Sequence, residues 1–273
     1  MVGTAPSTRR WLCLERTEPW PRDINQDRDP RVRALLVRAA AAGFRPLMIR
    51  STEGGPDRRP PRIYLTDTAP GRTATTALDI ERPGQLDDLP LPEPDHPLSG
   101  VPVNEPMLLI CTHEQRDPCC GREGRGLVDT IAGAGVFAVS HLGGHRFAPT
   151  ALVLPTGYTY GRLDPTSAAA IFAGAAAGVV TTDRCRGRST WSQRGQVAEL
   201  AVRETTGLRA PDALTVVDDS ADTVQVATAT GERWAVDVEA VEVDTTRPVS
   251  CGARLTLMVP LRAASVRVLR PSL

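Results

Sequence analysis

The chain has 273 residues, of which 41% are hydrophobic, so it is long enough to bury a substantial core and to divide into two or three small modules. Its 32 basic and 32 acidic residues cancel, and this balance provides no overall field that would favour nucleic acid. Apart from the histidines, every basic residue is an arginine. The absence of lysine excludes Schiff-base enzymes, phosphate-loop nucleotide hydrolases and protein kinases, because each of these needs a reactive lysine.

The N-terminal residues do not predict export. The stretch "STRRWLCLER" is superficially similar to a twin-arginine signal, but the apolar run after the arginines is too short for a signal peptide. No stretch approaches the roughly 20 apolar residues that a membrane span needs. We therefore expect a cytoplasmic protein with reduced thiols, in which clustered cysteines are metal ligands or redox groups rather than structural disulfides.

Residues 1–100 predict an N-terminal α/β unit. Its expected elements are a strand over 10–16, a helix over 29–43, and strands over 45–51 and 62–67. Asp29 and Pro30 are typical of the N-cap and the first position of that helix. Residues 84–102 are rich in proline and acidic side chains, which indicates a linker or surface loop.

Residues 101–206 predict a second, more regular α/β domain. Its expected elements are strands over 107–111 and 136–140, a helix over 124–135, a hairpin over 150–163, and helices over 164–180 and 196–206. This order of β-α-β-β-β-α is that of a thioredoxin-like fold. Short alternating segments over residues 207–273 predict a β-rich C-terminal extension.

Two motifs concentrate the cysteines and histidines of the chain. "CTHEQRDPCCG" begins at Cys111, where the first central strand ends, and "SHLGGH" places His141 and His145 just after the second. Parallel strands joined by a helical crossover end at the same edge of a sheet, so we expect the two loops to be neighbours. The glycine pair between the histidines favours a tight loop that turns both imidazoles toward one centre. Two thiolates and two imidazoles at one sheet edge predict a metal site.

The two motifs resemble those of the sucrase/ferredoxin-like family, with the strongest similarity over residues 105–205. The shared elements are Cys111-Thr112-His113, Arg116-Asp117, Cys120-Gly121 and the His141 to His145 pair. The resemblance implies a thioredoxin-like ferredoxin domain whose [2Fe-2S] cluster is held by Cys111, Cys120, His141 and His145. It also implies a single-electron carrier that works with a redox partner protein, either a reductase or an electron acceptor, rather than an enzyme with its own substrate.

Four further residues of the first motif are expected near the implied cluster. Cys119 directly precedes Cys120, and adjacent side chains generally cannot enter the same small site; the Cys-Gly pair of the family favours Cys120 as the ligand. His113 forms the C-x-H spacing of a Rieske site, but no second C-x-x-H follows. We therefore expect His113, Cys119, Arg116 and Asp117 beside the ligands, where they hydrogen-bond to a ligand or pack.

Imidazole ligands would change the chemistry of the implied cluster. Exchanging two thiolates for neutral imidazoles leaves an oxidised [2Fe-2S] centre formally neutral, which raises its reduction potential. The ring nitrogen that does not bind iron can exchange a proton, so electron transfer is expected to be coupled to proton transfer at His141 or His145.

Two other functions remain open on the sequence. A Cys2His2 set also binds structural zinc, although the eight residues between Cys111 and Cys120 exceed the usual zinc-finger spacing. A thiol-disulfide oxidoreductase could use Cys119 with Cys120, or Cys111 with Cys120, but the C-x-x-C motif is missing and vicinal disulfides are strained.

Outside these motifs the sequence offers weaker signals. Residues 183–194 contain Arg184, Arg186, Arg188 and Arg194. This stretch predicts either a docking patch for an acidic electron-transfer partner or a solvated loop and helix face. Cys13, Cys185 and Cys251 are isolated and predict packed thiols, and His96 predicts an exposed linker residue. We expect no nucleic-acid or membrane partner.

Overall fold

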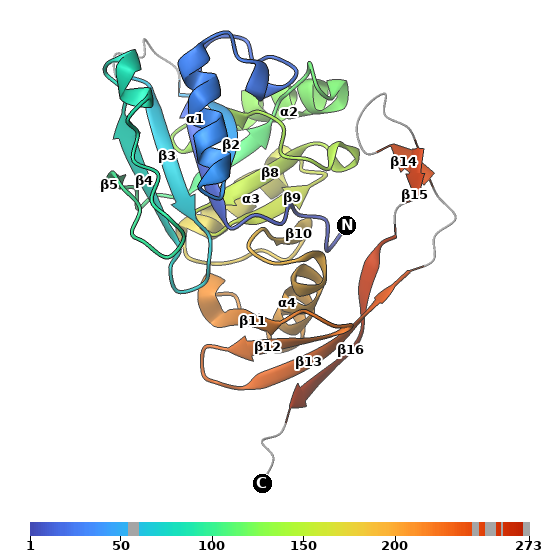
Figure 1. The fold of residues 1–273 in the computed structure, drawn as a ribbon. Helices are drawn as coiled ribbons and strands as arrows, with labels where there is room; N and C mark the ends of the chain where they lie inside the picture. Colours follow the sequence, from blue (N-terminus) through green and yellow to red (C-terminus); the bar gives the residue numbers. More distant parts are fainter. Residues whose placement is uncertain (54–59, 242–245, 249–254, 258, 270–273) are drawn as a thin grey trace.

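A ten-stranded mixed sheet organises most of the chain (Figure 1). The computed structural model describes residues 1–53, 60–241, 246–248, 255–257 and 259–269. From edge to edge the sheet contains β10 (Cys185–Arg188), β9 (Tyr158–Gly161), β8 (Thr150–Leu154), β6 (Met107–Cys111), β7 (Val136–Val139), β2 (Phe44–Ser51), β1 (Arg10–Glu15), β3 (Arg62–Asp67), β4 (Ala74–Asp79) and β5 (Val101–Pro102). The α/β class expected from the sequence is confirmed.

Two parallel strand pairs form the centre of this sheet, each joined by one helix. Helix α1 (Pro30–Ala41) connects β1 to β2, and α2 (Pro118–Ile131) connects β6 to β7. The pairing of β2 with β7 is antiparallel and joins the two halves into one sheet. The predicted boundary at residue 100 stays a prediction, since both of the first two predicted units contribute strands to this sheet.

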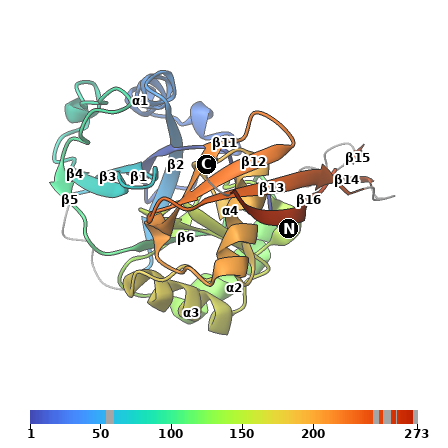
Figure 2. The same ribbon diagram turned by 90° about the horizontal axis from the view of Figure 1, so that it is seen from below.

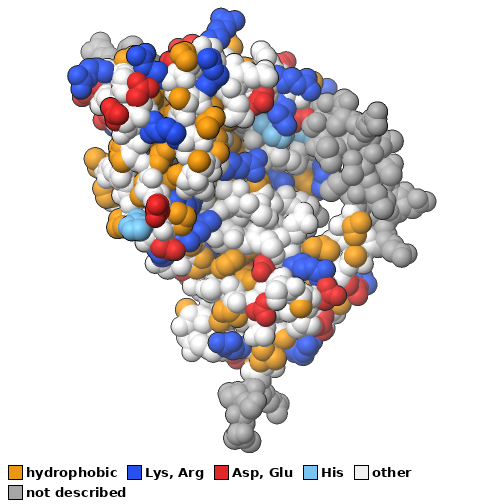
Figure 3. Space-filling model, viewed as in Figure 1, with side chains coloured by type: hydrophobic (Ala, Val, Ile, Leu, Met, Phe, Trp, Pro, Cys, Tyr) orange, Lys and Arg blue, Asp and Glu red, His pale blue; other side chains and the backbone are white. Residues whose placement is uncertain are grey.

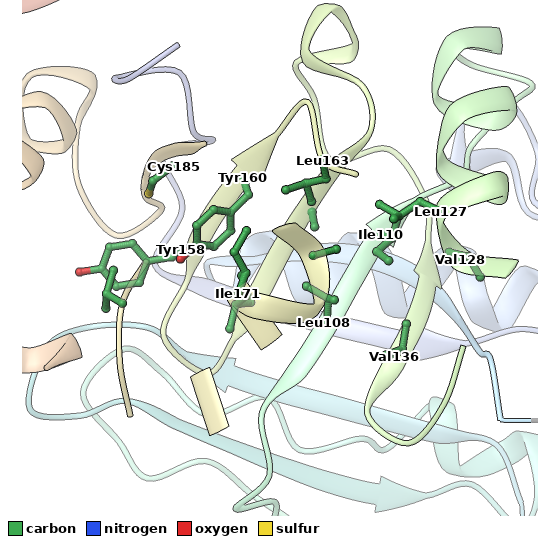
Figure 4. Packing of buried hydrophobic residues seen from close by; sticks show 14 of the residues in the cluster. Leu108, Ile110, Leu127, Val128, Val136, Tyr158, Tyr160, Leu163, Ile171 and Cys185 are labelled. Atoms are coloured by element: carbon green, nitrogen blue, oxygen red, sulfur yellow. The ribbon is translucent and has the colours of Figure 1, made fainter. Parts of the chain in front are cut away.

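The helices cover opposite faces of the sheet. Figure 2 shows α1 on one side, with α2 and α3 (Pro165–Ala176) on the other. Asp29 and Asp164 cap α1 and α3, since each carboxylate accepts a backbone N–H from the first turn. Under α2 and α3 lies an apolar core in which Leu108 and Ile110 of β6 meet Leu127 of α2 (Figure 4).

The inner faces of the two halves pack against each other because the sheet curls. Trp11 of β1 and Leu109 of β6 belong to one buried cluster, and Tyr64 of β3 lies edge-on to Phe137 of β7 with ring centroids 5.8 Å apart. The Trp11 indole N–H donates to the Ser189 hydroxyl just after β10. Cys111 and Cys120 belong to this same interior cluster, so the candidate site is built on the inner face of the curled sheet.

A second, four-stranded sheet follows in the C-terminal part. It contains β11 (Leu214–Asp218), β12 (Thr223–Thr228), β13 (Arg233–Ala240) and β16 (Leu261–Leu269). Its valines pack on α4 (Gln193–Thr206), which lies between this sheet and the large one (Figure 1). A short ribbon pairs β14 (Thr246–Pro248) with β15 (Leu255–Leu257). The strands expected in this part of the chain are confirmed where the structure describes them.

Four short 3-10 segments complete the described elements. They are η1 (Ile24–Gln26), η2 (Pro83–Leu86), η3 (His145–Phe147) and η4 (Pro211–Ala213). The predicted linker over 84–102 is mostly irregular but is packed rather than free. Leu86 and Leu89 are buried, and the guanidinium of Arg38 on α1 donates to their backbone carbonyls.

Helix α2 differs from its prediction in a way that matters for the site. It begins at Pro118 rather than at Gly124, which places Cys119 and Cys120 in its first turn. Glycine lowers helix propensity, so the sequence predicted a loop there. The structure shows why glycine is present: a Cβ at Gly124 would lie closer than 3.0 Å to the carbonyl oxygen of Cys111, and one at Gly121 would overlap Glu114.

We expect Gly124→Ala to destabilise the protein by about 1–3 kcal/mol, because its methyl group cannot fit against the end of β6. The matched control is Gly126→Ala on the exposed side of the same helix, where nothing lies within 4 Å. This control should be neutral or stabilising by up to about 1 kcal/mol, since alanine favours helix. Urea unfolding of both variants measures the difference, and equal effects would show that α2 does not depend on this close approach.

Candidate functional site

The two motifs of the sequence meet at one edge of the sheet. β6 and β7 are parallel, and Cys111 at the end of β6 is in register with Val139 at the end of β7. His141 follows β7, and His145 begins the 3-10 turn η3. We call residues 112–117, between β6 and α2, the Cys loop, and residues 140–144, between β7 and η3, the His loop. The expectation that these two loops adjoin is therefore confirmed.

Cys111 and Cys120 form a buried pair of free thiols. The Cys111 side chain is hydrogen-bonded first to Cys120 and also to His141, and the backbone N–H groups of His113 and Leu142 contribute. These contacts hold the pKa of the Cys111 thiol well below its ordinary value, against the opposing effect of burial. The same hydrogen bond, with burial, raises the pKa of Cys120. The pair thus shares one proton: Cys111 holds the negative charge and Cys120 donates.

Cys119 faces a different partner from its neighbour. Its sulfur lies 3.4 Å from Nδ1 of His145 and 3.7 Å from the His145 carbonyl oxygen. Cys119 is half-buried, whereas Cys120 is 1% exposed. The two cysteines thus contact different groups, and the choice of Cys120 as the ligand stays a prediction.

A buried carboxylate lies between the two histidines. Asp117 is fully buried at the N-cap position of α2, with Oδ2 3.0 Å from Nδ1 of His141. Its Oδ1 lies 3.9 Å from Nδ1 of His145. A carboxylate in this position orients an imidazole and selects which ring nitrogen carries the proton.

His113 and Arg116 follow Cys111 in the Cys loop, but their interactions are with residues other than Cys120, His141 and His145. The His113 ring nitrogen Nε2 is 3.0 Å from the Pro21 carbonyl oxygen, and its ring meets Trp20 edge-on. Burial lowers the pKa of His113. Arg116 is half-buried, and its positive charge acts on Arg45. Of the four additional residues expected near the site, Asp117 and Cys119 therefore contact the histidines directly.

Arg186 is a site residue that the sequence analysis missed. Its buried guanidinium donates to the Gly143 carbonyl at 3.1 Å and to the Thr4 hydroxyl at 3.1 Å. Gly144 has a φ of 77°, and a Cβ there would overlap this guanidinium. The arginine therefore ties the His loop to β10 and to the N-terminal residues. The two adjacent glycines were a signal of this close approach.

The predicted docking patch over residues 183–194 is wrong. Arg186 and Arg188 are buried, and Arg188 donates to the Thr68 carbonyl and to Asp212, because β10 turns these side chains into the molecule. Only the flanking Arg184 and Arg194 are partly exposed, and they pair with Asp164 and Asp222.

The isolated cysteines and the remaining histidine agree with expectation where they are described. Cys13 and Cys185 are buried free thiols, and His96 is exposed. Cys251 lies outside the described residues. Within the described ranges, no helix has both the length and the apolar character needed to cross a membrane. The compartment stays a prediction.

Comparison with known proteins identifies a family. A model of the sucrase/ferredoxin-like family matches residues 1–187, more than half of the chain. The chain is similar to "Altered inheritance of mitochondria protein 32" of Eremothecium gossypii, with 33% identity over 113 residues. That stretch is 39% of this chain and 32% of the relative, so the chain spans about a third of the relative's length. No solved structure matches the chain.

These findings correct the predicted function. Among the residues described by the structure, no group of three or more His, Cys, Asp or Glu side chains is placed to hold a metal ion. In the described residues His145 faces Cys119 and His141 lies 3.0 Å from Asp117, while Cys111 adjoins both Cys120 and His141. The matched relative is named for mitochondrial inheritance and not for electron transfer. The [2Fe-2S] electron carrier and the zinc module are therefore not supported.

The alternative that paired Cys119 with Cys120 stays a prediction, although the Cys119 sulfur contacts His145 and Cys120 interacts with Cys111. The cofactor itself, its assignment to Cys111, Cys120, His141 and His145, and the redox partner protein are tested by neither the structure nor the comparisons. They stay predictions.

We expect the Cys111 thiol to ionise at a lower pH than an ordinary cysteine. Because Cys120 and His141 lower the pKa of Cys111, its ultraviolet thiolate absorbance should persist below the pH at which an ordinary cysteine is protonated, and should disappear as the pH falls through the lowered pKa. Cys111→Ser should remove this signal. Cys185→Ser should not, since burial raises the pKa of Cys185 and keeps that thiol protonated. A wild-type signal that appears only above pH 9 would contradict the shared-proton pair.

Proposed function

The chain belongs to the sucrase/ferredoxin-like family, and we propose that it is a thiol redox protein in which Cys111 and Cys120 cycle between a dithiol and a disulfide. The observation that carries this proposal is the placement of the two free thiols in one buried cluster, where each shifts the pKa of the other. Two neighbouring sulfurs can form a bond with little movement of the backbone.

The surroundings of the pair favour the reactive form of cysteine. The thiolate is the nucleophile in exchange reactions, and Cys111 is stabilised as a thiolate by the Cys120 thiol, by His141 and by two backbone N–H groups. Cys120 lies in the first turn of α2, where the unpaired N–H groups and the helix dipole favour negative charge. Either sulfur can therefore serve as a leaving group when the disulfide is reduced.

The oxidant in this proposal is a low-molecular-weight disulfide. The Cys111 thiolate attacks one of its sulfur atoms, the disulfide bond breaks, and one thiol leaves after taking up a proton. Cys120 then loses its proton and attacks the Cys111 sulfur of the mixed disulfide, which releases the second thiol. Two electrons pass from the protein to the small disulfide, and the protein retains a Cys111–Cys120 disulfide.

We also propose that the strands around β6 and β7 have a thioredoxin-like arrangement. It is supported by the parallel β6 and β7 joined by α2, by the antiparallel β8 and β9, and by α3 on the same face as α2. In that arrangement a cysteine in the first turn of a helix is well placed for exchange.

Peptide mapping tests the proposal directly. Trypsin cleavage after Arg116 separates Cys111 from the peptide Asp117 to Arg122, which contains both Cys119 and Cys120. Oxidation by a small disulfide should therefore link two tryptic peptides, while a vicinal Cys119–Cys120 disulfide would remain within one. The link should persist in Cys119→Ser and in the matched control Cys185→Ser, and should be lost in Cys120→Ser and Cys111→Ser.

Two outcomes would contradict the proposal. One is a reduced protein in which no link between these peptides forms across the range of glutathione redox buffers. The other is anaerobically purified protein that contains stoichiometric iron and inorganic sulfide, because Cys111 and Cys120 would then be occupied as ligands. The second outcome would instead support the cofactor predicted from the sequence.

A further inference from the structure

A cavity of about 530 Å³ lies beside the Cys loop. Its wall is formed by the Cys loop, by the connection between β1 and η1, by the end of β2 and by α2. Figure 1 shows this connection, in blue, at the top of the molecule beside α2. The volume is within the range of small-molecule sites. Neither Cys111 nor Cys120 is among the described residues that line the cavity, so a ligand here would occupy a site separate from the thiol pair.

Two arginines from separate elements supply positive charge to the cavity: Arg50 at the end of β2 and Arg125 on α2. The guanidinium of Arg50 lies over the Trp20 ring, 4.9 Å from its centroid, and its Nη2 donates to the Thr17 and Glu18 carbonyls at 3.2 Å. In the described part of the chain, no carboxylate forms an ion pair with Arg50, and its Nε and Nη1 have no hydrogen-bond partner. These two nitrogens are not enclosed by protein, so they are available to a ligand.

The wall of the cavity carries one unbalanced positive charge. Arg125 forms an ion pair with Glu114, so these two charges offset each other. Glu18 attracts Arg50 from nearby, but its carboxylate pairs with Arg16 at 3.5 Å. Burial, and then the charge of Arg125, lower the pKa of Arg50, because both disfavour its charged form. A ligand with one negative charge would match this wall.

The rest of the wall offers uncharged polar groups. The hydroxyls of Thr17 and Thr112 and the amide of Gln115 form no side-chain hydrogen bond with the residues that the structure describes. Nδ1 of His113 and the indole N–H of Trp20 also lack a partner there, but both nitrogens are covered by protein. The open partners for a ligand are therefore the threonines and the glutamine. Hydroxyl groups suit such a wall, because each of them can both donate and accept a hydrogen bond.

We infer that this cavity binds a small hydroxylated carboxylate that carries a single negative charge. Its carboxylate contacts the guanidinium groups of Arg50 and Arg125, and its hydroxyls pair with Thr17, Thr112 and Gln115. A planar guanidinium matches the geometry of a carboxylate. Figure 3 shows arginine side chains at the surface along the top of the molecule, where the connection after β1 and α2 lie, and such charges steer an anion toward the cavity. The inference does not depend on the thiol redox function.

Nuclear magnetic resonance of the full chain, labelled with nitrogen-15, tests the binding and locates it. The indole N–H signal of Trp20, assigned with Trp20→Phe, reports on the cavity because Arg50 lies over this ring. At constant ionic strength, gluconate should shift this signal in a saturable manner. Sorbitol lacks the carboxylate and should leave the signal unchanged. Acetate lacks the hydroxyls and should bind at least several-fold more weakly than gluconate.

Variants link the binding to the two arginines. Arg50→Gln and Arg125→Gln should each weaken gluconate binding several-fold, because each removes one positive charge from the wall. The matched control is Arg122→Gln, which removes the same charge from a side chain on α2 that is 81% exposed and pairs with Glu123; it should bind gluconate as the wild type does. Arg125 is itself exposed, so Arg125→Gln keeps the test valid if Arg50→Gln is destabilised.

Three results would overturn the inference. The first is the absence of a saturable shift of the Trp20 signal with gluconate. The second is a gluconate affinity that is unchanged in both Arg50→Gln and Arg125→Gln. The third is tighter binding of inorganic phosphate than of gluconate at the same ionic strength, which would assign the cavity to phosphate groups instead. Each of these results leaves the thiol redox function intact, because that function is tested by the link between Cys111 and Cys120.

Discussion

The contact between the start of α2 and the end of β6 is the constraint on which the candidate site depends. Gly124 packs against the Cys111 carbonyl and Gly121 against Glu114, at distances that no side chain would permit. This approach places Cys120 beside Cys111 and brings Asp117 to the histidines. A methyl group at either glycine would push α2 away from the end of β6. This shift would separate Cys120 from Cys111 and Asp117 from the histidines.

A second constraint comes from the curling of the sheet. Because β10 returns to the inner side, Arg186 reaches the His loop from one direction and the N-terminal residues from another. Burial lowers the pKa of Arg186 to about 10, and its guanidinium donates to the Gly143 carbonyl and the Thr4 hydroxyl. These contacts fix the His loop against β10.

The structure changes the chemical meaning of the cysteine and histidine motifs. As residue types, two cysteines and two histidines are a ligand set, and the family to which the chain belongs made that interpretation natural. In the folded chain, the side chains are arranged in pairs: one thiol with another, a thiol with an imidazole, and an imidazole with a carboxylate. Such pairs hold and move protons, which is the requirement of thiol exchange.

The sequence by itself determined the elements and their order. The capping residue Asp29 and the hydrophobic strands are local signals that predicted the elements. The helical crossover between β6 and β7 predicted that the Cys and His loops would adjoin. Tertiary structure alone decided the start of α2, the partners of Cys119 and Cys120, and the burial of Arg186 and Arg188. The physical reason is that local propensity reports only how well a residue suits a helix, whereas the packing of distant segments determines whether a glycine admits a close contact or an arginine is buried.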